Sequence, residues 1–140
     1  MFRKFILLFF SVSVLYSCQP AGSKSDAPAS LIIGKWQSVK PDIGQTYIFK
    51  AGNKIDWIFN PGSGEDTFHL DYTLIDSVTP HFLDLSGFNR GPLEGMVLFG
   101  LAEFRQNDTL AFDFELSEPG QVIRPKDFNG PDVVLYKRVK

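Results

Sequence analysis

Cysteine is almost absent from this chain of 140 residues, which contains a single one, Cys18. A lone cysteine cannot form an internal disulfide, and one sulfur is poor evidence for a metal site. Histidine is also scarce. His69 and His81 fall on separate predicted strands without an H-x-H or H-E-x-x-H spacing, so we interpret both as surface residues rather than metal ligands. The sequence therefore predicts neither a bound metal nor a cofactor.

Motifs that would indicate catalysis are lacking as well. No G-x-S-x-G nucleophile elbow occurs, and after Cys18 no cysteine remains for nucleophilic chemistry. Segment 62–64, Gly-Ser-Gly, resembles a turn rather than a phosphate loop, because neither a lysine nor a helix follows it. We expect no catalytic residues and no enzyme. The carboxylates on predicted outward strand faces are interpreted as solvated: Asp56, Asp71, Asp113 and Glu115.

Dense positive charge is also absent. The chain has 14 Lys and Arg residues and 16 Asp and Glu residues, and its basic residues form no cluster. If Arg3 and Lys4 are removed with the start of the chain, the rest carries a more negative net charge than the full sequence. Because nucleic-acid binding calls for a basic face, we expect no nucleic-acid partner.

Long apolar runs are limited to one, at residues 5–16, which follows Arg3 and Lys4 and is broken only by Ser11 and Ser13. A helix that crosses a bilayer needs roughly 20 apolar residues, so this run is too short. A basic start, a short apolar core and a small residue before a cleavage site are typical of a secretory signal. We therefore interpret residues 1–17 as a signal peptide and exclude them from the folded part.

The end of that signal, Leu15-Tyr16-Ser17-Cys18, resembles the lipobox of bacterial lipoproteins. The resemblance implies cleavage before Cys18, a diacylglyceryl thioether on its sulfur and an acyl chain such as palmitate on the new amino end. Two or more chains hold a protein stably at a membrane, at about 0.8 kcal/mol per buried methylene. Gln19 is not acidic, which in such lipoproteins favours the outer membrane over the inner one. We expect a lipid-anchored protein of the cell envelope that faces the periplasm.

Residues 18–30 are expected to form a flexible tether behind the lipidated cysteine. This segment is rich in Pro, Gly, Ala and Ser and has no periodic apolar face that could be buried. The folded part is then residues 31–140, a length that suits one domain.

Period-two alternation dominates this folded part. In segment 66–76, Phe68, Leu70 and Tyr72 face one way and polar residues face the other, and segment 108–116 alternates similarly. Such alternation is typical of half-buried antiparallel strands. No segment shows a convincing helical stripe. With turn residues between them, eight strands are expected, at 32–39, 45–50, 54–60, 66–76, 81–85, 94–104, 108–116 and 132–139.

Eight short strands joined by tight turns favour an all-β fold, and in particular an antiparallel up-and-down barrel without exposed sheet edges. An aromatic stripe would fill or line its interior. The candidates to line an interior ligand site are Tyr47, Trp57, Phe59, Phe68, Tyr72, Phe112 and Phe114.

The start and end of the domain resemble a known family. Gly34-Lys35-Trp36 is similar to the G-x-W signature of lipocalins, in which the tryptophan closes one end of the barrel beneath an arginine of the last strand. The resemblance implies that role for Arg138. The tail, with Asp108, Leu110, Pro119-Gly120 and then Arg124, Pro125 and Phe128, looks like that of small bacterial lipocalin-like domains, whose function is generally unknown.

Arg124 has two interpretations. It is either an anion clamp at the barrel mouth or, as we favour, a loop arginine that pairs with an acid or caps carbonyls while Pro125 and Phe128 pin the loop.

Two functions remain open at this point. The first is a membrane-anchored module that binds a small apolar or lipid-like ligand inside the barrel. The second is a packed barrel that serves as a protein-interaction or inhibitor module in the periplasm, with Phe88 and Arg90 exposed on the loop 86–95. An internal void would favour the first function and a filled interior the second.

Overall fold

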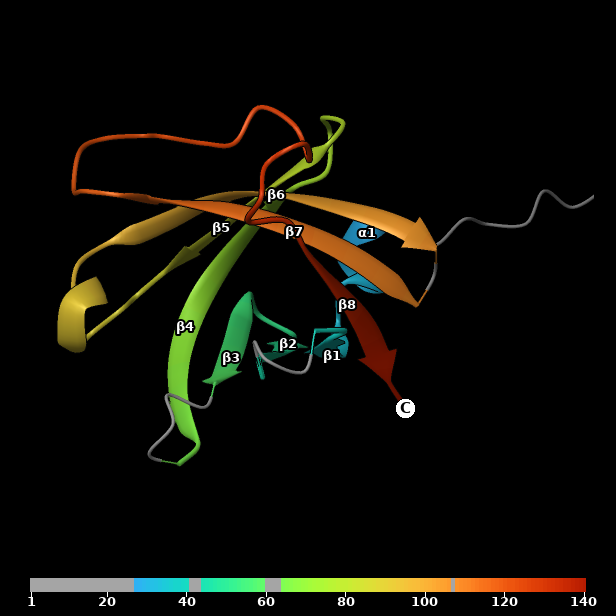
Figure 1. Ribbon diagram of the computed structural model, residues 1–140, viewed down its shortest axis with the longest axis horizontal. Coiled ribbons are helices and arrows are strands. Elements are labelled where there is room, and N and C mark those ends of the chain that lie inside the picture. The colour runs from blue at the N-terminus through green and yellow to red at the C-terminus, as the bar shows by residue number, and fades with distance from the viewer. Residues whose placement is uncertain (1–26, 41–43, 60–63, 107) are drawn as a thin grey trace, which may run out of the picture.

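The computed structural model describes residues 27–40, 44–59, 64–106 and 108–140, which form a closed barrel of eight antiparallel strands in sequence order (Figure 1). The predicted all-β, up-and-down barrel is thereby confirmed. A short helix α1 (Pro28–Leu31) precedes the barrel, and a 3-10 helix η1 (Gly91–Leu93) lies between the fifth and sixth strands. The strands are β1 (Gly34–Ser38), β2 (Thr46–Lys50), β3 (Lys54–Phe59), β4 (Asp66–Ile75), β5 (His81–Ser86), β6 (Val97–Gln106), β7 (Thr109–Ser117) and β8 (Val134–Val139).

Three strands begin two or three residues later than the sequence predicts, and the first of them, expected at 32–39, starts at Gly34. The strand expected at 94–104 starts at Val97, because η1 and a turn at Gly95, whose φ is 75°, occupy the residues before it. The strand expected at 132–139 starts at Val134. Residues 28–30, which we expected in the tether, instead belong to α1, where Pro28 takes the first-turn position that proline favours.

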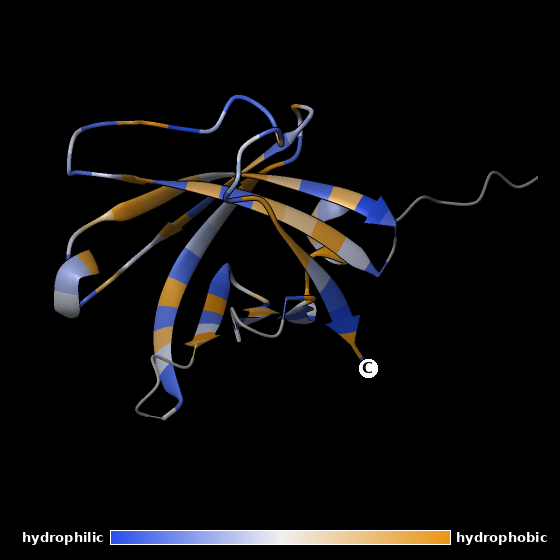
Figure 2. Ribbon diagram, in the orientation of Figure 1, coloured by the Kyte–Doolittle hydropathy of each residue, from blue (hydrophilic) through white to orange (hydrophobic). Residues whose placement is uncertain are grey.

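The alternation along β4 follows the prediction. Phe68, Leu70 and Tyr72 are buried, whereas His69 and Asp71 between them are exposed, and Figure 2 shows the matching colour bands along this strand. β7 does not show this alternation of buried and exposed residues, because its outward-facing residues Ala111 and Asp113 are buried as well. The second face of β7 is therefore covered by another part of the chain.

The two ends of the barrel carry connections of different length. Antiparallel neighbours alternate the end at which they are joined, so residues 51–53, 76–80 and 108 lie at one end, here called the closed end, together with α1. The longer connections lie at the other, the open end, and the structure describes their residues 39–40, 44–45, 64–65, 87–96 and 118–133.

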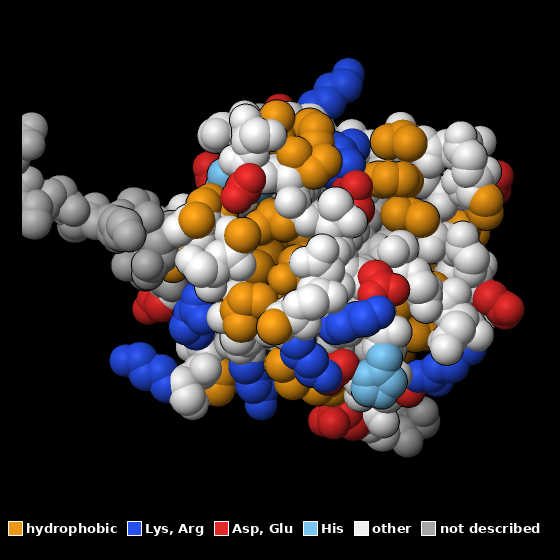
Figure 3. Space-filling model, turned by 180° about the vertical axis from the view of Figure 1, so that it is seen from behind, with side chains coloured by type: hydrophobic (Ala, Val, Ile, Leu, Met, Phe, Trp, Pro, Cys, Tyr) orange, Lys and Arg blue, Asp and Glu red, His pale blue; other side chains and the backbone are white. Residues whose placement is uncertain are grey.

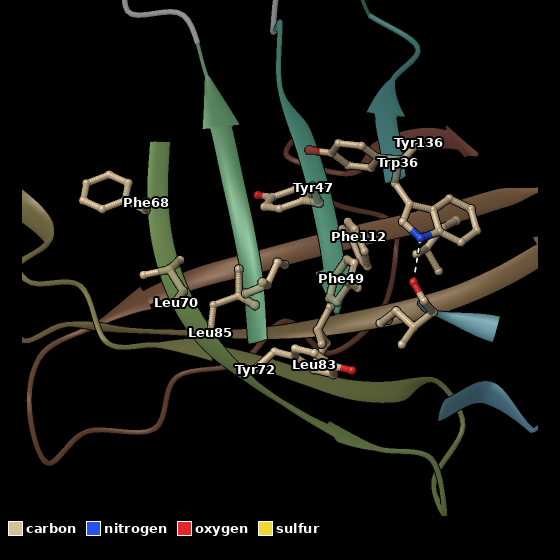
Figure 4. Packing of buried hydrophobic residues seen from close by; sticks show 14 of the residues in the cluster. Trp36, Tyr47, Phe49, Phe68, Leu70, Tyr72, Leu83, Leu85, Phe112 and Tyr136 are labelled. Atoms are coloured by element: carbon tan, nitrogen blue, oxygen red, sulfur yellow. Dashed lines mark hydrogen bonds between the residues drawn. The ribbon is translucent and has the colours of Figure 1, made fainter. Parts of the chain in front are cut away.

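Trp36 fills the closed end. Its side chain is fully buried, and its Nε1 donates a hydrogen bond to the Ile32 carbonyl at 2.7 Å, drawn as a dashed line in Figure 4. The Arg138 guanidinium lies 4.3 Å from the indole centroid and donates to the carbonyls of Ile33 and Leu31. The arginine-over-tryptophan packing expected from the lipocalin resemblance is present. Contacts of this type contribute about 0.5–2 kcal/mol.

Gly34 is required by the same cluster. Its φ is +132°, and a Cβ there would lie 2.7 Å from Nη1 of Arg138. A side chain at this position would displace the guanidinium that covers Trp36. This steric demand gives a physical reason for the glycine in the G-x-W motif.

The middle of the barrel is filled. Figure 4 shows the buried cluster running from Trp36 on one side to Phe68 on the other, with Phe49 and Phe112 between them. The rings of Phe49 and Phe112 are 5.9 Å apart, and Leu83 is fully buried beneath the cluster. Dense packing of this kind leaves no central channel in the closed half.

Residues 118–133, here called the strap, join β7 to β8 and cover the outer faces of β5, β6 and β7. Arg124 Nη1 lies 2.7 Å from Asp84 Oδ1 and donates to the Gly100 carbonyl, and its guanidinium lies 4.2 Å from the Phe82 centroid. Farther along the strap, Phe128 packs beneath Arg105 at 5.9 Å. Arg124 therefore pins the strap to the sheet, as we favoured from the sequence, and lies on the outer face rather than at the mouth.

Candidate functional site: the open end of the barrel

A hollow of about 200 Å³, here called the inner pocket, enters the barrel between β2, β3, β6, β7 and β8. Five aromatic side chains make up most of its wall, and polar side chains of the flanking connections lie at its edge. Tyr47 connects the rings: it stacks on Trp57 at 5.9 Å and meets the edge of Phe112 at 5.5 Å. The lining residues are Gln45, Tyr47, Trp57, Leu98, Phe112, Phe114, Asp132, Val134 and Tyr136.

A second hollow of about 590 Å³, here called the rim groove, lies between the tips of β3 and β4 and the connection 87–96. Phe59 and Phe68 form its floor, stacked with centroids 5.6 Å apart and planes 11° apart. Trp57 lines both this groove and the inner pocket, so the two hollows adjoin at its ring. The lining residues are Trp57, Phe59, Asp66, Phe68, Arg90, Gly91, Pro92 and Leu93.

An ion pair fixes the outer wall of the rim groove. Arg90 donates from Nη1 to Asp66 Oδ2 at 3.0 Å and from Nη2 to Asp66 Oδ1 at 2.5 Å and the Thr67 carbonyl at 2.8 Å. The hydrogen bond from Arg90, and then that from the Thr67 amide, lower the pKa of the Asp66 carboxyl. The pair is largely exposed, so its value lies in positioning the connection 87–96 rather than in global stability.

Phe88 corrects our interpretation of the loop 86–95. We expected its ring to be exposed on an interaction surface, but only 3% of the residue is accessible. Its edge meets Phe68 at 5.3 Å and Trp57 at 6.0 Å, so it supports the walls of the rim groove from within. Arg90, the other residue proposed for that surface, is engaged by Asp66.

Two phenols carry polar atoms into the inner pocket. The Tyr136 hydroxyl donates to Gln45 Oε1 at 2.9 Å, and the Tyr136 ring lies 5.2 Å from that of Tyr47 (Figure 4). Burial, and then the neighbouring Tyr136 phenol, raise the pKa of Tyr47 well above its usual value, and burial raises the pKa of Tyr136. Both phenols are therefore uncharged at neutral pH.

Most of the interior candidates named from the sequence come together here, but one does not. Tyr72 lies in the closed half, with its ring 5.0 Å from Phe49 and its hydroxyl donating to the Lys50 carbonyl at 3.5 Å. It lines neither the inner pocket nor the rim groove but a separate hollow of about 330 Å³ at the closed end, so its assignment to a ligand site stays a prediction. The six that line the hollows are Tyr47, Trp57, Phe59, Phe68, Phe112 and Phe114.

Sequence reasoning missed the residues that the long connections and β8 bring to the mouth. Tyr136 shares the inward face of β8 with Val134, and this alternation was the available signal. Gln45, Leu93 and Asp132 have no local signal, because their position depends on where the long connections end. These missed residues are Gln45, Asp66, Leu93, Leu98, Asp132, Val134 and Tyr136.

A cluster of ion pairs occupies the outer face of β2, β3 and β4. Asp56 accepts from Lys50 Nζ at 2.5 Å and lies 2.8 Å from His69 Nδ1, whereas Asp71 pairs with Lys54. Although burial raises the pKa of the Asp56 carboxyl, its hydrogen bonds to Lys50 and His69 lower it overall. Figure 3 shows basic and acidic side chains next to one another on the back of the molecule. Within the described ranges, no three His, Cys, Asp or Glu residues are grouped to hold a metal ion.

Asp113 corrects our expectation of a solvated carboxylate. Only 6% of the residue is exposed beneath the strap, where Gly130 comes close to its Oδ2. Burial raises the pKa of its carboxyl, and the nearby charges of Asp132 and Glu115 raise it further. The underside of the strap is therefore an acidic region close to the inner pocket.

Lipid attachment at Cys18 stays a prediction, because Cys18 and the rest of residues 1–26 lie outside the described ranges. In the part of the chain that the structure covers, no helix has the length and apolar character needed to span a bilayer. Comparison with family models, with curated proteins and with solved structures found no match to this chain in any of the three.

Proposed function

We propose that this chain is a lipid-anchored protein of the bacterial cell envelope whose barrel binds a small, mostly apolar ligand at its open end. One observation carries the proposal: two aromatic hollows adjoin at Trp57 where the barrel is left unfilled. Concave, mainly apolar sites with a few polar groups are the usual form of small-molecule sites.

The sizes of the hollows favour a ligand that is received at the mouth rather than enclosed. Small-molecule sites commonly measure about 300–1,000 Å³, a range that includes the rim groove but not the inner pocket. The apolar body of a ligand would lie in the rim groove, against Phe59 and Phe68. A smaller end would reach past Trp57 into the inner pocket. The packed closed half would stop deeper entry.

The position of the first described residues is consistent with an anchor. α1 lies at the closed end, where Arg138 donates to the Leu31 carbonyl. A lipid attached at Cys18 would therefore hold the protein from the closed end and leave the open end accessible. The family resemblance, Gln19 and the signal-like start supply the remaining support for an outer-membrane lipoprotein.

A second candidate, a protein-interaction module, is supported by an apolar patch on the strap side. Val122 and Ile123 are 71% and 49% exposed on the strap. Ser117 Oγ accepts a hydrogen bond from the Ile123 amide at 3.0 Å, which fixes this turn beside the end of β7. The patch lies on the strap rather than on the loop 86–95 that we expected to carry such a surface.

A neutral fluorescent naphthylamine, N-phenyl-1-naphthylamine, tests ligand binding. We expect the full chain, purified in a maltoside detergent, to bind the probe at one site, and Trp57→Ala to weaken that binding at least tenfold. Val122→Ala, a truncation on the strap, is the matched control and should leave the affinity unchanged. A probe that binds equally well to Trp57→Ala and the unaltered chain would contradict a ligand site at the mouth.

The anchor is tested separately by Cys18→Ser. We expect the unaltered chain to sediment with membranes after carbonate washing. We expect the variant to be either uncleaved or soluble, and in both cases its mass should lack the attached acyl chains. An unaltered chain whose mass shows no acyl chains would overturn the anchor without affecting the ligand site.

A further inference from the structure

We infer that the inner pocket takes the positively charged end of an organic cation, such as a small quaternary ammonium group. This inference rests on the proposed function, because it names the chemistry of the ligand bound at the mouth. It is carried by three features of the pocket: its rings, its charge and its hydrogen bonds.

Five of the nine residues that line the inner pocket are aromatic. Phe112 lies 5.1 Å from Tyr136 and 5.6 Å from Phe114, while Tyr47 joins this group to Trp57 at 5.9 Å. Ring faces attract a cation by their negative quadrupole, most strongly that of tryptophan, and the attraction grows when the cation is desolvated. A volume of about 200 Å³ suits a methylated ammonium head and excludes a bulky one.

The charges around the pocket are acidic. Asp132 lies at its edge, and no Lys or Arg is among the described residues that line it. Asp132, Glu115 and Asp127 all lie close enough to Asp113 to raise the pKa of that buried carboxyl. Negative charge concentrated at a low-dielectric wall attracts cations and disfavours a carboxylate or phosphate.

Arg90 and Arg124 are already engaged by acids. Arg90 donates to Asp66 across the rim groove, and Arg124 lies 2.7 Å from Asp84 on the outer face. The guanidinium groups are thus held by acids of their own and do not cancel the charge of Asp132. Among the described residues, no ion pair engages Asp132 at the edge of this pocket.

The hydrogen bonds of the pocket leave acceptors for the ligand. The Tyr136 hydroxyl donates its proton to Gln45 Oε1, so its oxygen remains available only as an acceptor. Trp57 Nε1 is buried and has no hydrogen-bond partner among the described residues.

Choline and 3,3-dimethylbutan-1-ol test the inference, because they have the same shape and differ in that a neutral carbon replaces the charged nitrogen. We expect calorimetry on the full chain to show choline binding about tenfold more tightly than the alcohol, equivalent to about 1.4 kcal/mol. Asp132→Asn should lower the choline affinity at least threefold and leave the alcohol unaffected. Asp76→Asn makes the same charge change in the connection 76–80 at the closed end and should alter neither affinity.

The outcomes separate this inference from the proposed function. Equal affinity for the two compounds, or no binding of choline, would overturn the cationic ligand, while Trp57-dependent binding of the naphthylamine would keep the mouth as a ligand site. Choline binding that Asp132→Asn leaves unchanged would overturn the inner pocket as its location. Loss of both choline and naphthylamine binding would overturn both proposals.

Discussion

The closed and open ends of this barrel contain similar aromatic residues, but these residues are packed differently at the two ends. Each end has one of the two tryptophans of the chain. Trp36 is fully buried, with its Nε1 bonded to Ile32 and its ring covered by Arg138. Trp57 is partly buried, its Nε1 is unpartnered among the described residues, and it lines both the inner pocket and the rim groove. A tryptophan that is fully buried and hydrogen-bonded indicates a structural role, whereas one that lines hollows and has an unpartnered Nε1 indicates a candidate site.

The largest effect expected from this difference is on stability. Trp36→Ala should lower the free energy of unfolding by about 3–5 kcal/mol, because it removes a fully buried ring and leaves Arg138 without its partner. Trp57→Ala should cost only about 1–2 kcal/mol, since its ring is already partly exposed. Urea denaturation measures both. If Trp57→Ala lowered the free energy of unfolding as much as Trp36→Ala does, the proposed difference between the two ends would be contradicted.

The strap, which starts and finishes at the open end, should depend on Arg124. Arg124→Ala leaves the partly buried Asp84 carboxylate without its cation, and we expect a loss of about 2–3 kcal/mol. Hydrogen exchange of the amides in residues 118–133 should quicken before that of the closed end. Arg124→Lys is the control that keeps the charge but not the paired donors, so it should recover part of the loss. Unchanged exchange in the strap of Arg124→Ala would contradict its pinning role.

Gly100 tests how closely the inner pocket depends on the packing beneath it. A Cβ at this position would lie 2.2 Å from Cδ1 of Phe114 and 2.8 Å from the Asp113 carbonyl oxygen. Gly100→Ala should therefore displace Phe114, destabilise the protein by about 1–2 kcal/mol and change the affinity for the naphthylamine. Ala102→Gly, on the same inward face of β6 but in the closed half, should leave that affinity unchanged. Equal probe affinities for Gly100→Ala and the unaltered chain would show that ligand binding in the pocket does not depend on this packing.

The smallest expected effect is a gain in stability when Asp113 is replaced by Asn. Burial raises the pKa of the Asp113 carboxyl above the usual 3.8, so the native state binds more protons than the unfolded state between that value and the raised one. Stability contributed by the protonated carboxyl is thus lost as pH rises through this interval. Asp113→Asn should raise the free energy of unfolding by about 1 kcal/mol at pH 7 and by nearly nothing at pH 3.

Denaturation curves at the two pH values check the Asp113 prediction, with the exposed neighbour Glu115→Gln as a matched control. A variant that is less stable than the unaltered chain at pH 7 would show that the Asp113 carboxylate is stabilised beneath the strap.

Where burial follows from local alternation, the sequence predicted it well. The period of β4 placed Phe68, Leu70 and Tyr72 inward, and the strand alternates as expected. The closed end was also predictable, because Gly34, Trp36 and Arg138 form a recognisable motif and occupy the two strands that close the barrel. Each of these predictions rests on neighbours in sequence or on paired strands.

Where burial depends on long connections, the sequence predicted it poorly. Phe88 looked exposed because nothing local shows that residues 87–96 turn back onto Phe68. Asp113 looked solvated because the strap that covers it begins after its strand has ended. Tyr136 and Gln45, whose hydrogen bond forms the edge of the inner pocket, are 91 positions apart. The candidate site lies where such contacts gather, which is why only its aromatic floor was foreseen.

The indole signals of the two tryptophans test the central claim most directly. In a nitrogen-15 correlation spectrum of the full chain, titration with the neutral naphthylamine should shift the Nε1–H signal of Trp57 and leave that of Trp36 in place. The Trp36 proton should also exchange slowly with solvent because it is bonded to Ile32 at a buried site. A titration that shifts Trp36 and spares Trp57 would contradict a closed, structural end opposite an open, ligand-binding one.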